Sequence, residues 1–367
     1  MKILVTGSNG FIGKNLVTRL REQEDHEVLC FDRSCSTEDL KVLVSQVDFV
    51  YHLAGVTRPE NDKQFFEGNL DLTKLLLDSL VASGNTVPVV LTSSSQVVRD
   101  NPYGRSKEGA ESAVLSYMQS TGANSYIYRL PNVFGKWSKP NYNSVVATFC
   151  YNTVNDLRID VHDSNAEITL AYIDDVCDNF ISLLSAEAVG GFKEVSNVYH
   201  TTIGDIAKLL HKFKESRDSL LSETVGTGFT RALYSTYVSY LRPEMFTYSV
   251  PTHSDARGSF VEMLKTPTAG QFSFFTAHPG VTRGGHYHHT KTEKFLVIKG
   301  SARFGFKHIL TNEKYFINTS GDQPEIVETV PGWSHDITNV GDDELVVMLW
   351  ANEIFDRNKP DTIYSEV

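Results

Sequence analysis

The sequence has few cysteines and neither a long apolar run nor a cluster of basic residues. Its four cysteines show no Cys-x-x-Cys spacing and all precede residue 180, so we expect reduced thiols and no disulfide. No apolar run reaches the length of about 18 residues that a membrane-spanning helix needs. A strand pattern begins at once where a secretory leader would show a basic and then an apolar segment. These absences predict a soluble, cytoplasmic protein with no membrane partner.

The overall charge is acidic. The chain has 34 basic and 45 acidic residues, a formal net charge of −11, and no Lys/Arg-rich tract. Nucleic acid is therefore not an expected partner. Because the overall field repels phosphate, a phosphate-bearing substrate has to be held by local backbone N–H groups and a few placed arginines.

The pattern of predicted helices and strands changes along the 367 residues, which predicts two domains. Up to about residue 135, short apolar runs alternate with longer helical patterns, which is typical of a doubly wound parallel sheet. From about residue 249, short strands separated by Gly, Pro, Asn and Asp turns indicate an all-β barrel or sandwich. We predict an α/β domain with a substrate-covering lobe in residues 1–245 and an all-β domain in residues 246–367. Seven of the twelve histidines lie in the second domain, which indicates separate chemistry there.

The first strand, Lys2–Thr6, leads directly into glycines 7, 10 and 13. Gly7 and Gly10 allow a tight turn close to a pyrophosphate, and Gly13 lets the following helix pack close to the strand. The N-terminus of that helix then faces the negative charge of the phosphates. This arrangement predicts a dinucleotide-binding turn.

The second strand ends at Asp32, nineteen residues after Gly13, which is close to the position of the acidic ribose ligand in such domains. Asp32 would accept a hydrogen bond from the ribose 2′-OH of NAD. Arg33 could instead clamp the 2′-phosphate of NADP. Both alternatives stay open on the residues.

A Tyr-x-x-x-Lys pair follows the fourth predicted strand. Tyr103 and Lys107 share one face of a helix, since residues four apart are neighbours on its surface. The ammonium is expected to lower the tyrosine pKa from about 10, which makes Tyr103 a usable general acid or base. A serine hydroxyl at the strand end can bind the same substrate oxygen. We predict Tyr103 and Lys107 as catalytic residues, together with a serine of the run at residues 93–95.

These features resemble the extended short-chain dehydrogenases/reductases that act on nucleotide sugars, which have a Rossmann-like fold. Further matching motifs are His52-Leu-Ala54-Gly55, Gly68-Asn69, Arg129-x-Pro-Asn132-Val-Phe-Gly135 and Tyr172-Ile-Asp174-Asp175. The resemblance implies that Ser95 is the catalytic hydroxyl, with Ser94 as the alternative, and that Asn132 lies by the cofactor and the sugar diphosphate. Dehydratase members carry an Asp-Glu pair where Ser95-Gln96 stands here, so keto-reduction is expected instead of dehydration.

The resemblance also implies a set of cofactor contacts in this chain. The expected residues are Gly7, Asn9, Gly10, Phe11, Ile12, Gly13, Asp32, Arg33, Leu53, Ala54, Gly55, Tyr103 and Lys107. The expected substrate-binding residues are Ser94, Asn132 and Arg283.

Histidines and a glutamate form a second candidate site in the all-β domain. His286 and His288 would lie on the same side of a strand, whose side chains alternate. Glu293, and His335 after a Pro-Gly turn, can complete the set from neighbouring strands. Three imidazoles and a carboxylate suit zinc or another first-row divalent ion. We predict a metal site, most simply for zinc.

These segments resemble the cupin motifs. The fragments Asp255–Phe260 and Thr282–Tyr287 resemble the deoxysugar 3,5-epimerase branch of the cupins, in which the histidine of the second fragment is the base. His286 is therefore either a ligand or a base.

The order of the two sites and the tail Phe355–Asp361 resemble, over the full length, the bifunctional capsule and O-antigen precursor enzymes of the CapF/WbjC/FnlB type. The resemblance implies a homodimer that acts on a UDP-2-acetamido-2,6-dideoxy-4-keto hexose. It implies C3 epimerisation in the cupin and NADPH-dependent C4 reduction to UDP-N-acetyl-6-deoxy-L-talosamine, on the route to N-acetyl-L-fucosamine. Two alternatives stay open: a simple reductase whose cupin only dimerises and binds sugar, and a nonenzymatic NADP(H)-binding sensor.

Overall fold

The computed structural model describes residues 1–185, 188–255, 258–261, 263–264, 266, 270–353 and 358–367. The chain divides into two compact units, Met1–Lys139 with Ile168–His200 and Pro140–Glu167 with Thr201–Val367. This division differs from the predicted boundary at residue 245, because the helices of the expected lobe pack with the β-strands that follow them. Arg257 and Phe355 of the fragments named above lie outside the described residues.

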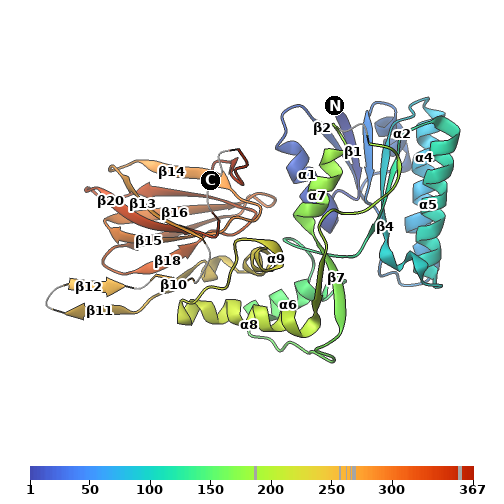
Figure 1. Ribbon diagram of the computed structural model, residues 1–367. Coiled ribbons are helices and arrows are strands. Elements are labelled where there is room, and N and C mark those ends of the chain that lie inside the picture. The colour runs from blue at the N-terminus through green and yellow to red at the C-terminus, as the bar shows by residue number, and fades with distance from the viewer. Residues whose placement is uncertain (186–187, 256–257, 262, 265, 267–269, 354–357) are drawn as a thin grey trace. The chain divides into compact units, whose positions relative to one another are not determined.

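The first unit contains a six-stranded parallel sheet in the order β2-β1-β3-β4-β5-β8 (Figure 1). Its strands are β1 (Lys2–Thr6), β2 (Glu27–Phe31), β3 (Phe49–His52), β4 (Val89–Ser94), β5 (Tyr126–Leu130) and β8 (Gly191–Lys193). A small sheet, β6-β7-β9, consists of β6 (Asn132–Phe134), β7 (Glu167–Tyr172) and β9 (Tyr199–Thr202). The parallel sheet confirms the predicted α/β fold class.

Helices cover both faces of this sheet, with α4 and α5 on one face and α1 and α7 on the other (Figure 1). Their bounds are α1 (Phe11–Arg21), α2 (Thr37–Val44), α3 (Lys63–Phe65), α4 (Leu72–Ala82), α5 (Pro102–Thr121) and α7 (Ile173–Ser182). A π-helical turn, η1 (Phe66–Asp71), precedes α4, and a 3-10 turn, η2 (Ser95–Val98), follows β4. Leu76, Leu77 and Leu80 of α4 are buried against the sheet, because the apolar stripe of the helix faces it.

The second unit contains two five-stranded antiparallel sheets and a hairpin, β11 (Thr252–Asp255) with β12 (Gly258–Val261). One sheet is β10 (Thr247–Ser249), β18 (Glu325–Glu328), β15 (Glu293–Lys299), β20 (Leu345–Ala351) and β13 (Gln271–Ala277). The other is β17 (Lys314–Ser320), β16 (Ser301–His308), β19 (Trp333–Asn339), β14 (Thr282–Tyr287) and β21 (Ile363–Tyr364). Buried Phe295 and Phe304 meet between the sheets with ring centroids 5.6 Å apart. This is the β-domain predicted from the sequence.

Three helices of the second unit pack on one another: α6 (Val145–Val154), α8 (Ile203–Ser219) and α9 (Gly228–Val238). A 3-10 turn, η3 (Pro243–Met245), leads into β10. A buried charge cluster joins them to the strands, since Glu328 of β18 accepts hydrogen bonds from Arg217 of α8, Tyr234 of α9 and Lys294 of β15. Because the buried Glu328 carboxylate is paired with Arg217 and Lys294, separating the helices from the β-strands would leave buried charges unpaired, so the helices belong to one unit with the strands.

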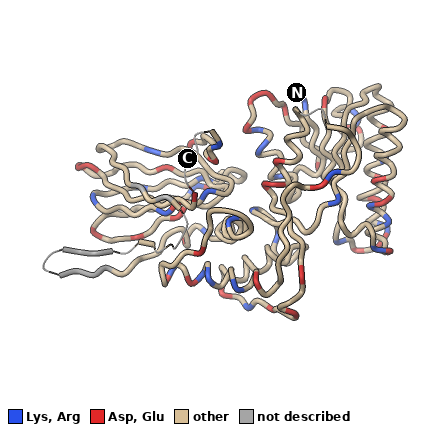
Figure 2. Tube along the Cα trace, in the orientation of Figure 1, with Lys and Arg blue, Asp and Glu red and all other residues tan. Residues whose placement is uncertain are grey.

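Basic and acidic residues are interspersed along the described trace (Figure 2). In the described part of the chain, no helix combines the length and the apolar character that crossing a membrane requires.

Candidate active site and metal centre

The glycine-rich turn between β1 and α1 is tightly packed. Gly7 has φ +68°, and a Cβ there would lie 2.7 Å from the backbone N of Ala54. A Cβ on Gly13 would lie 2.1 Å from the carbonyl O of Gly7. Both positions therefore exclude side chains, as a turn that brings its backbone to a pyrophosphate requires. Phe11 and Ile12 begin α1 directly after this turn.

Asp32 follows β2 beside this turn. Its Oδ1 accepts hydrogen bonds from the backbone N and the hydroxyl of Ser34, at 2.8 and 2.6 Å, and its Oδ2 accepts one from the Asn9 side chain. The Ser34 hydrogen bonds, followed by that of Asn9, lower the pKa of Asp32, so the carboxylate is ionised. Arg33 lies exposed next to it.

The segment after β3 is fixed from two sides. Leu53 donates its N–H to the carbonyl O of Thr6, and Ala54 donates to the Thr6 hydroxyl, both at 3.2 Å. Beyond Gly55, the Asn69 side chain of η1 bonds both backbone groups of Val56, at 2.8 and 3.1 Å. The predicted contacts at 53–55 thus lie in an ordered segment beside the glycine-rich turn.

Helix α5 presents Tyr103 and Lys107 to the end of β4. It begins at Pro102, where the Asn101 side chain accepts a hydrogen bond from the N–H of Gly104 at 2.8 Å. Burial raises the pKa of Tyr103, and a hydrogen bond with the Ser94 hydroxyl opposes this shift. Ser94 is buried at the end of β4, whereas Ser95 is exposed at the start of η2. The structure therefore pairs Tyr103 with the alternative serine, Ser94.

Lys107 is buried, and its Nζ donates to the carbonyl O of Thr92 at 3.0 Å. Burial lowers its pKa to about 8, and the nearby Glu111 opposes the shift. The expectation that Tyr103 has a lowered pKa is wrong for this structure, because burial of the phenol dominates. A protonated Tyr103 is the form that can give up a proton.

Glu111 is a buried residue of this site that the sequence analysis missed. Its Oε1 accepts hydrogen bonds from the Ser93 hydroxyl at 2.5 Å and from Nε of Arg129 at 3.0 Å. Its Oε2 accepts a further one from Arg129 at 2.7 Å. Three successive residues of β4 therefore contact three successive turns of α5: Thr92 contacts Lys107, Ser93 contacts Glu111, and Ser94 contacts Tyr103. The four-residue spacing from Lys107 is the signal that could have indicated it.

Asn132 lies exposed on β6, where its side chain donates to the carbonyl O of Thr169 at 3.5 Å. Arg283 lies exposed on β14, with its guanidinium 5.0 Å from the ring centroid of Phe275 and a hydrogen bond to the carbonyl O of Thr276 at 3.2 Å. Their predicted roles in substrate binding stay predictions.

The second site brings together His286, His288, Glu293 and His335, whose candidate ligand atoms all lie within 4.8 Å of one another. His286 ends a bulged part of β14 in which Gly284 and Gly285 have φ of +100° and +77°. Its ring centroid lies 4.7 Å from that of His335 on β19 and 5.0 Å from that of His288. His288 follows the strand, and Glu293 begins β15. The neighbouring His289 is not among the four.

The protonation states of this set suit a cation. Burial, with the neighbouring His335 and His288, lowers the pKa of His286 to about 3, so its imidazole is neutral. Although burial would raise the pKa of Glu293, the two histidines hold it well below its usual value. Its Oε2 lies 3.1 Å from Nε2 of His288 and 3.3 Å from Nε2 of His335. Three imidazoles and one carboxylate are donors that zinc and related divalent ions accept.

Lys291 is a further residue at this site that the sequence analysis missed. Its Nζ lies 2.7 Å from Oε1 of Glu293, the oxygen that does not face the histidines. The lysine therefore fixes the rotation of the carboxylate. Lys291 lies two residues before the predicted ligand Glu293, and this position is the signal in the sequence that could have indicated its role.

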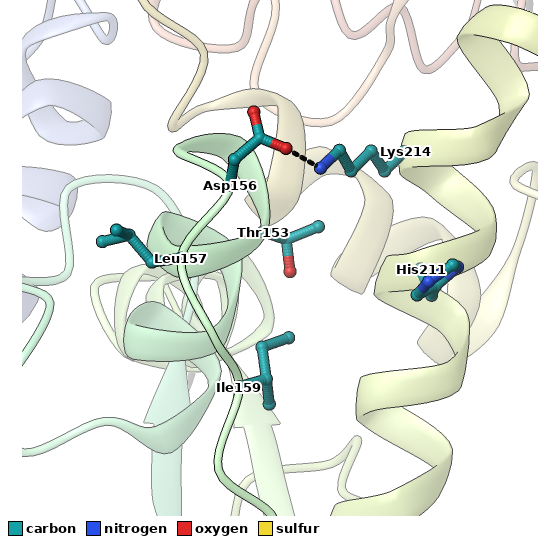
Figure 3. A pocket seen from close by; sticks show the side chains of 6 residues that line it. All are labelled: Thr153, Asp156, Leu157, Ile159, His211 and Lys214. Atoms are coloured by element: carbon teal, nitrogen blue, oxygen red, sulfur yellow. Dashed lines mark hydrogen bonds and ion pairs between the residues drawn. The ribbon is translucent and has the colours of Figure 1, made fainter.

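A pocket of about 330 Å³ lies between the end of α6 and helix α8 (Figure 3). It is lined by Thr153, Asp156, Leu157, Ile159, His211 and Lys214, and an ion pair joins Asp156 to Lys214. None of these residues was predicted as a site residue.

Comparisons with known proteins agree with this two-part organisation. Residues 3–198 match the NAD dependent epimerase/dehydratase family, and residues 253–363 match the polysaccharide biosynthesis C-terminal domain. The chain is 55% identical to the UDP-2-acetamido-2,6-beta-L-arabino-hexul-4-ose reductase of Pseudomonas aeruginosa, over 99% of this chain and 98% of that one.

Solved structures show the same relationship. The crystal structure of the capsular polysaccharide assembling protein CapF from Staphylococcus aureus is 43% identical, with a TM-score of 0.69 and 100% of both chains covered. A UDP-glucuronic acid 4-epimerase from Bacillus cereus in complex with NAD shares the fold at 21% identity and a TM-score of 0.53, over 58% of this chain and 83% of that one.

Fold and sites define an extended short-chain dehydrogenase/reductase joined to a cupin-type β-domain. The chain belongs to the NAD dependent epimerase/dehydratase family, among the CapF-like members that also carry the polysaccharide biosynthesis C-terminal domain. This confirms the family resemblance predicted from the motifs.

Proposed function

We propose that the chain is a bifunctional enzyme of UDP-linked 4-keto amino sugars. The β-domain epimerises the sugar at C3, and the first unit then reduces the C4 ketone with NADPH to UDP-N-acetyl-6-deoxy-L-talosamine. The proposal is carried by the presence in one chain of two separate sets of groups that each suit a ketone. The Pseudomonas relative supports it, since its name gives a hexul-4-ose, a sugar with the ketone at C4, as the substrate.

Reduction of the ketone requires a hydride at carbon and a proton at oxygen. The nicotinamide cofactor supplies the hydride when bound. Tyr103 donates the proton to O4, since its raised pKa keeps the phenol protonated. The Ser94 hydroxyl orients the same oxygen, and the Lys107 ammonium stabilises the phenolate that remains. We assign the catalytic hydroxyl to Ser94 because it bonds Tyr103 and is buried.

The choice of NADPH over NADH rests on the residue after Asp32. Arg33 lies exposed there, where a guanidinium can hold a 2′-phosphate bidentately. The single change Arg33→Ala tests this part of the proposal separately, as described in the Discussion.

Epimerisation at C3 requires removal and return of one proton. The ketone at C4 makes the C3 proton acidic, because the negative charge that remains spreads onto O4. A divalent cation held by His286, His288, Glu293 and His335 would stabilise that charge electrostatically. The closeness of His286 to the other three supports a role as ligand instead of base. Zinc is the proposed ion, from the donor types.

A second candidate function is a simple 4-ketoreductase whose β-domain only binds sugar and forms the dimer. Incubation with the UDP-2-acetamido-2,6-dideoxy-4-keto hexose in D2O without nicotinamide separates the two. The bifunctional enzyme incorporates deuterium at C3, whereas the simple reductase leaves C3 protonated. A nonenzymatic sensor would turn over no keto sugar even with NADPH present.

The homodimer and the cytoplasmic location belong to the same proposal, and the homodimer rests on the family resemblance. Light scattering of the purified chain tests the first, because a dimer has about twice the mass of the 41.0 kDa chain.

A further inference from the structure

The loop between the first two metal-site histidines and Glu293 is organised by a carboxylate from the far end of the chain. Asp361 accepts hydrogen bonds from the backbone N–H groups of His289, Thr290 and Lys291, at 2.9, 2.7 and 2.8 Å. It accepts a fourth from the Thr290 hydroxyl at 3.0 Å. Successive N–H groups that converge on one anion form a rigid nest, so this carboxylate sets the path of the loop.

The backbone of Asp361 also orients a candidate ligand. Its carbonyl O is hydrogen-bonded to Nδ1 of His288. A carbonyl can only accept, so Nδ1 carries the proton, and in the neutral imidazole Nε2 then presents a lone pair. That Nε2 lies 3.1 Å from Oε2 of Glu293. The hydrogen bond at Nδ1 therefore leaves Nε2, which is directed toward Glu293, as the atom that would bind a cation.

The tail around Asp361 is tied to the other histidine as well. Strand β21 pairs with β14, in a register that places Tyr364 opposite His286 and Ile363 opposite Tyr287. The N–H of Ser365 donates to the carbonyl O of Gly285 at 2.9 Å. The segment 358–367 therefore contacts the chain at His286 and at His288, two of the four candidate ligands.

Helix α9 holds the same loop from another side. The Ser235 hydroxyl donates to the carbonyl O of Thr290 at 2.7 Å, and Arg231 donates to the Thr290 hydroxyl. The side chain of Asn352 also donates to that carbonyl, at 3.3 Å. Thr290 thus joins the tail, helix α9 and the segment after β20, and the loop has little freedom to move on its own.

We propose that Asp361 is a positioning residue of the metal centre. Its carboxylate fixes the loop 289–291, and its carbonyl fixes the tautomer and direction of His288. The affinity and the coordination geometry of the cation therefore depend on the tail as well as on the four ligands. This inference rests on the metal-binding part of the proposed function. Groups that orient a metal ligand change metal affinity by about 10–100-fold when they are removed.

The test is cobalt binding to the full-length chain after chelation of bound metal. Co²⁺ reports its affinity by competition with a chromophoric chelator and its geometry by its visible absorption. Asp361→Asn retains the size of the side chain but loses acceptors of the nest, so we expect cobalt affinity to fall by about 10–100-fold and the absorption bands to change. Asp322→Asn, at an exposed position between β17 and β18, is the matched control and should bind cobalt as the unchanged chain does.

The outcomes separate this inference from the proposed function. If the unchanged chain binds no cobalt, the metal centre itself is wrong, and the role of Asp361 fails with it. If the unchanged chain and Asp361→Asn bind with equal affinity and equal spectra, only the role of Asp361 is overturned. Near-ultraviolet circular dichroism checks that the variant is folded. Should it not be, Thr290→Val, which removes the hydroxyl that donates to Asp361 and accepts from Arg231, is expected to weaken cobalt binding several-fold, and unchanged binding would contradict the inference.

Discussion

The charge of Glu111 is expected to set the pH range in which the reductase works. Glu111 lies one helical turn beyond Lys107 on α5 and raises the pKa of its ammonium against the effect of burial. Of the other ionisable groups near Lys107, His52 is neutral, because burial and Lys107 lower its pKa to about 3, and Tyr103 is protonated. Replacing Glu111 with Gln removes the negative charge that raises the pKa of Lys107 and leaves the Arg129 guanidinium nearby. The pKa of Lys107 must then fall.

The size of the effect follows from the position of that pKa. With a pKa of about 8, Lys107 is protonated in about three-quarters of molecules at about pH 7.5. If Glu111→Gln lowers the pKa by about one unit, or about 1.4 kcal/mol, about one-quarter remains protonated. The reaction requires the ammonium, so the rate at that pH falls about threefold. The basic limb of the pH profile moves about one unit lower, while the rate at low pH changes little.

The measurement is kcat/KM for the 4-keto sugar against pH, followed by NADPH oxidation. Glu108→Gln is the matched control, since Glu108 is exposed on the same helix and should leave the profile unchanged. Two superimposable basic limbs for Glu111→Gln and the unchanged enzyme would refute the reasoning.

Three further predictions concern single residues. Ser94→Ala should lower kcat of keto-reduction by about 10²-fold or more, whereas Ser95→Ala should lower it by less than about threefold, and the reverse order would show that Ser95 is the catalytic hydroxyl. Arg33→Ala should weaken NADPH binding by about 10–100-fold, from the loss of a charged hydrogen bond worth about 1.5–3 kcal/mol, with little change for NADH; equal losses for both cofactors would exclude a contact with the 2′-phosphate. His335→Ala should abolish both zinc retention, measured by elemental analysis, and deuterium exchange at C3, while it leaves reduction of an already epimerised keto sugar intact. Continued exchange would remove the cation from the mechanism.

The parts of the sites that the sequence predicted depend on local geometry. The spacing of Gly7 and Gly13 encodes a turn that the structure packs without room for a Cβ, and the four-residue spacing of Tyr103 and Lys107 encodes a shared helix face. The four candidate metal ligands were identified by donor type, and the structure brings them within 4.8 Å. Such patterns are visible in sequence because the chemistry itself fixes the spacing.

The parts that the sequence did not predict depend on contacts between distant segments. Ser94 and Ser95 are adjacent, and only the path of the backbone from β4 into η2 buries one and exposes the other. Asp361 acts on a loop at residues 289–291 through hydrogen bonds to backbone groups, which leave no pattern in the side chains of that loop. The glycine bulge before His286 likewise depends on pairing with β19. Tertiary pairing of this kind cannot be read from local periodicity.

The central claim is that one ketone is used twice, and a single labelled reaction tests it most directly. The full-length enzyme is incubated with the UDP-linked 4-keto sugar and NADPH in D2O, and the product is analysed by NMR. The account predicts deuterium at C3, taken from the solvent, together with protium at C4, delivered by NADPH. A reduced product that carries protium at both carbons would contradict it.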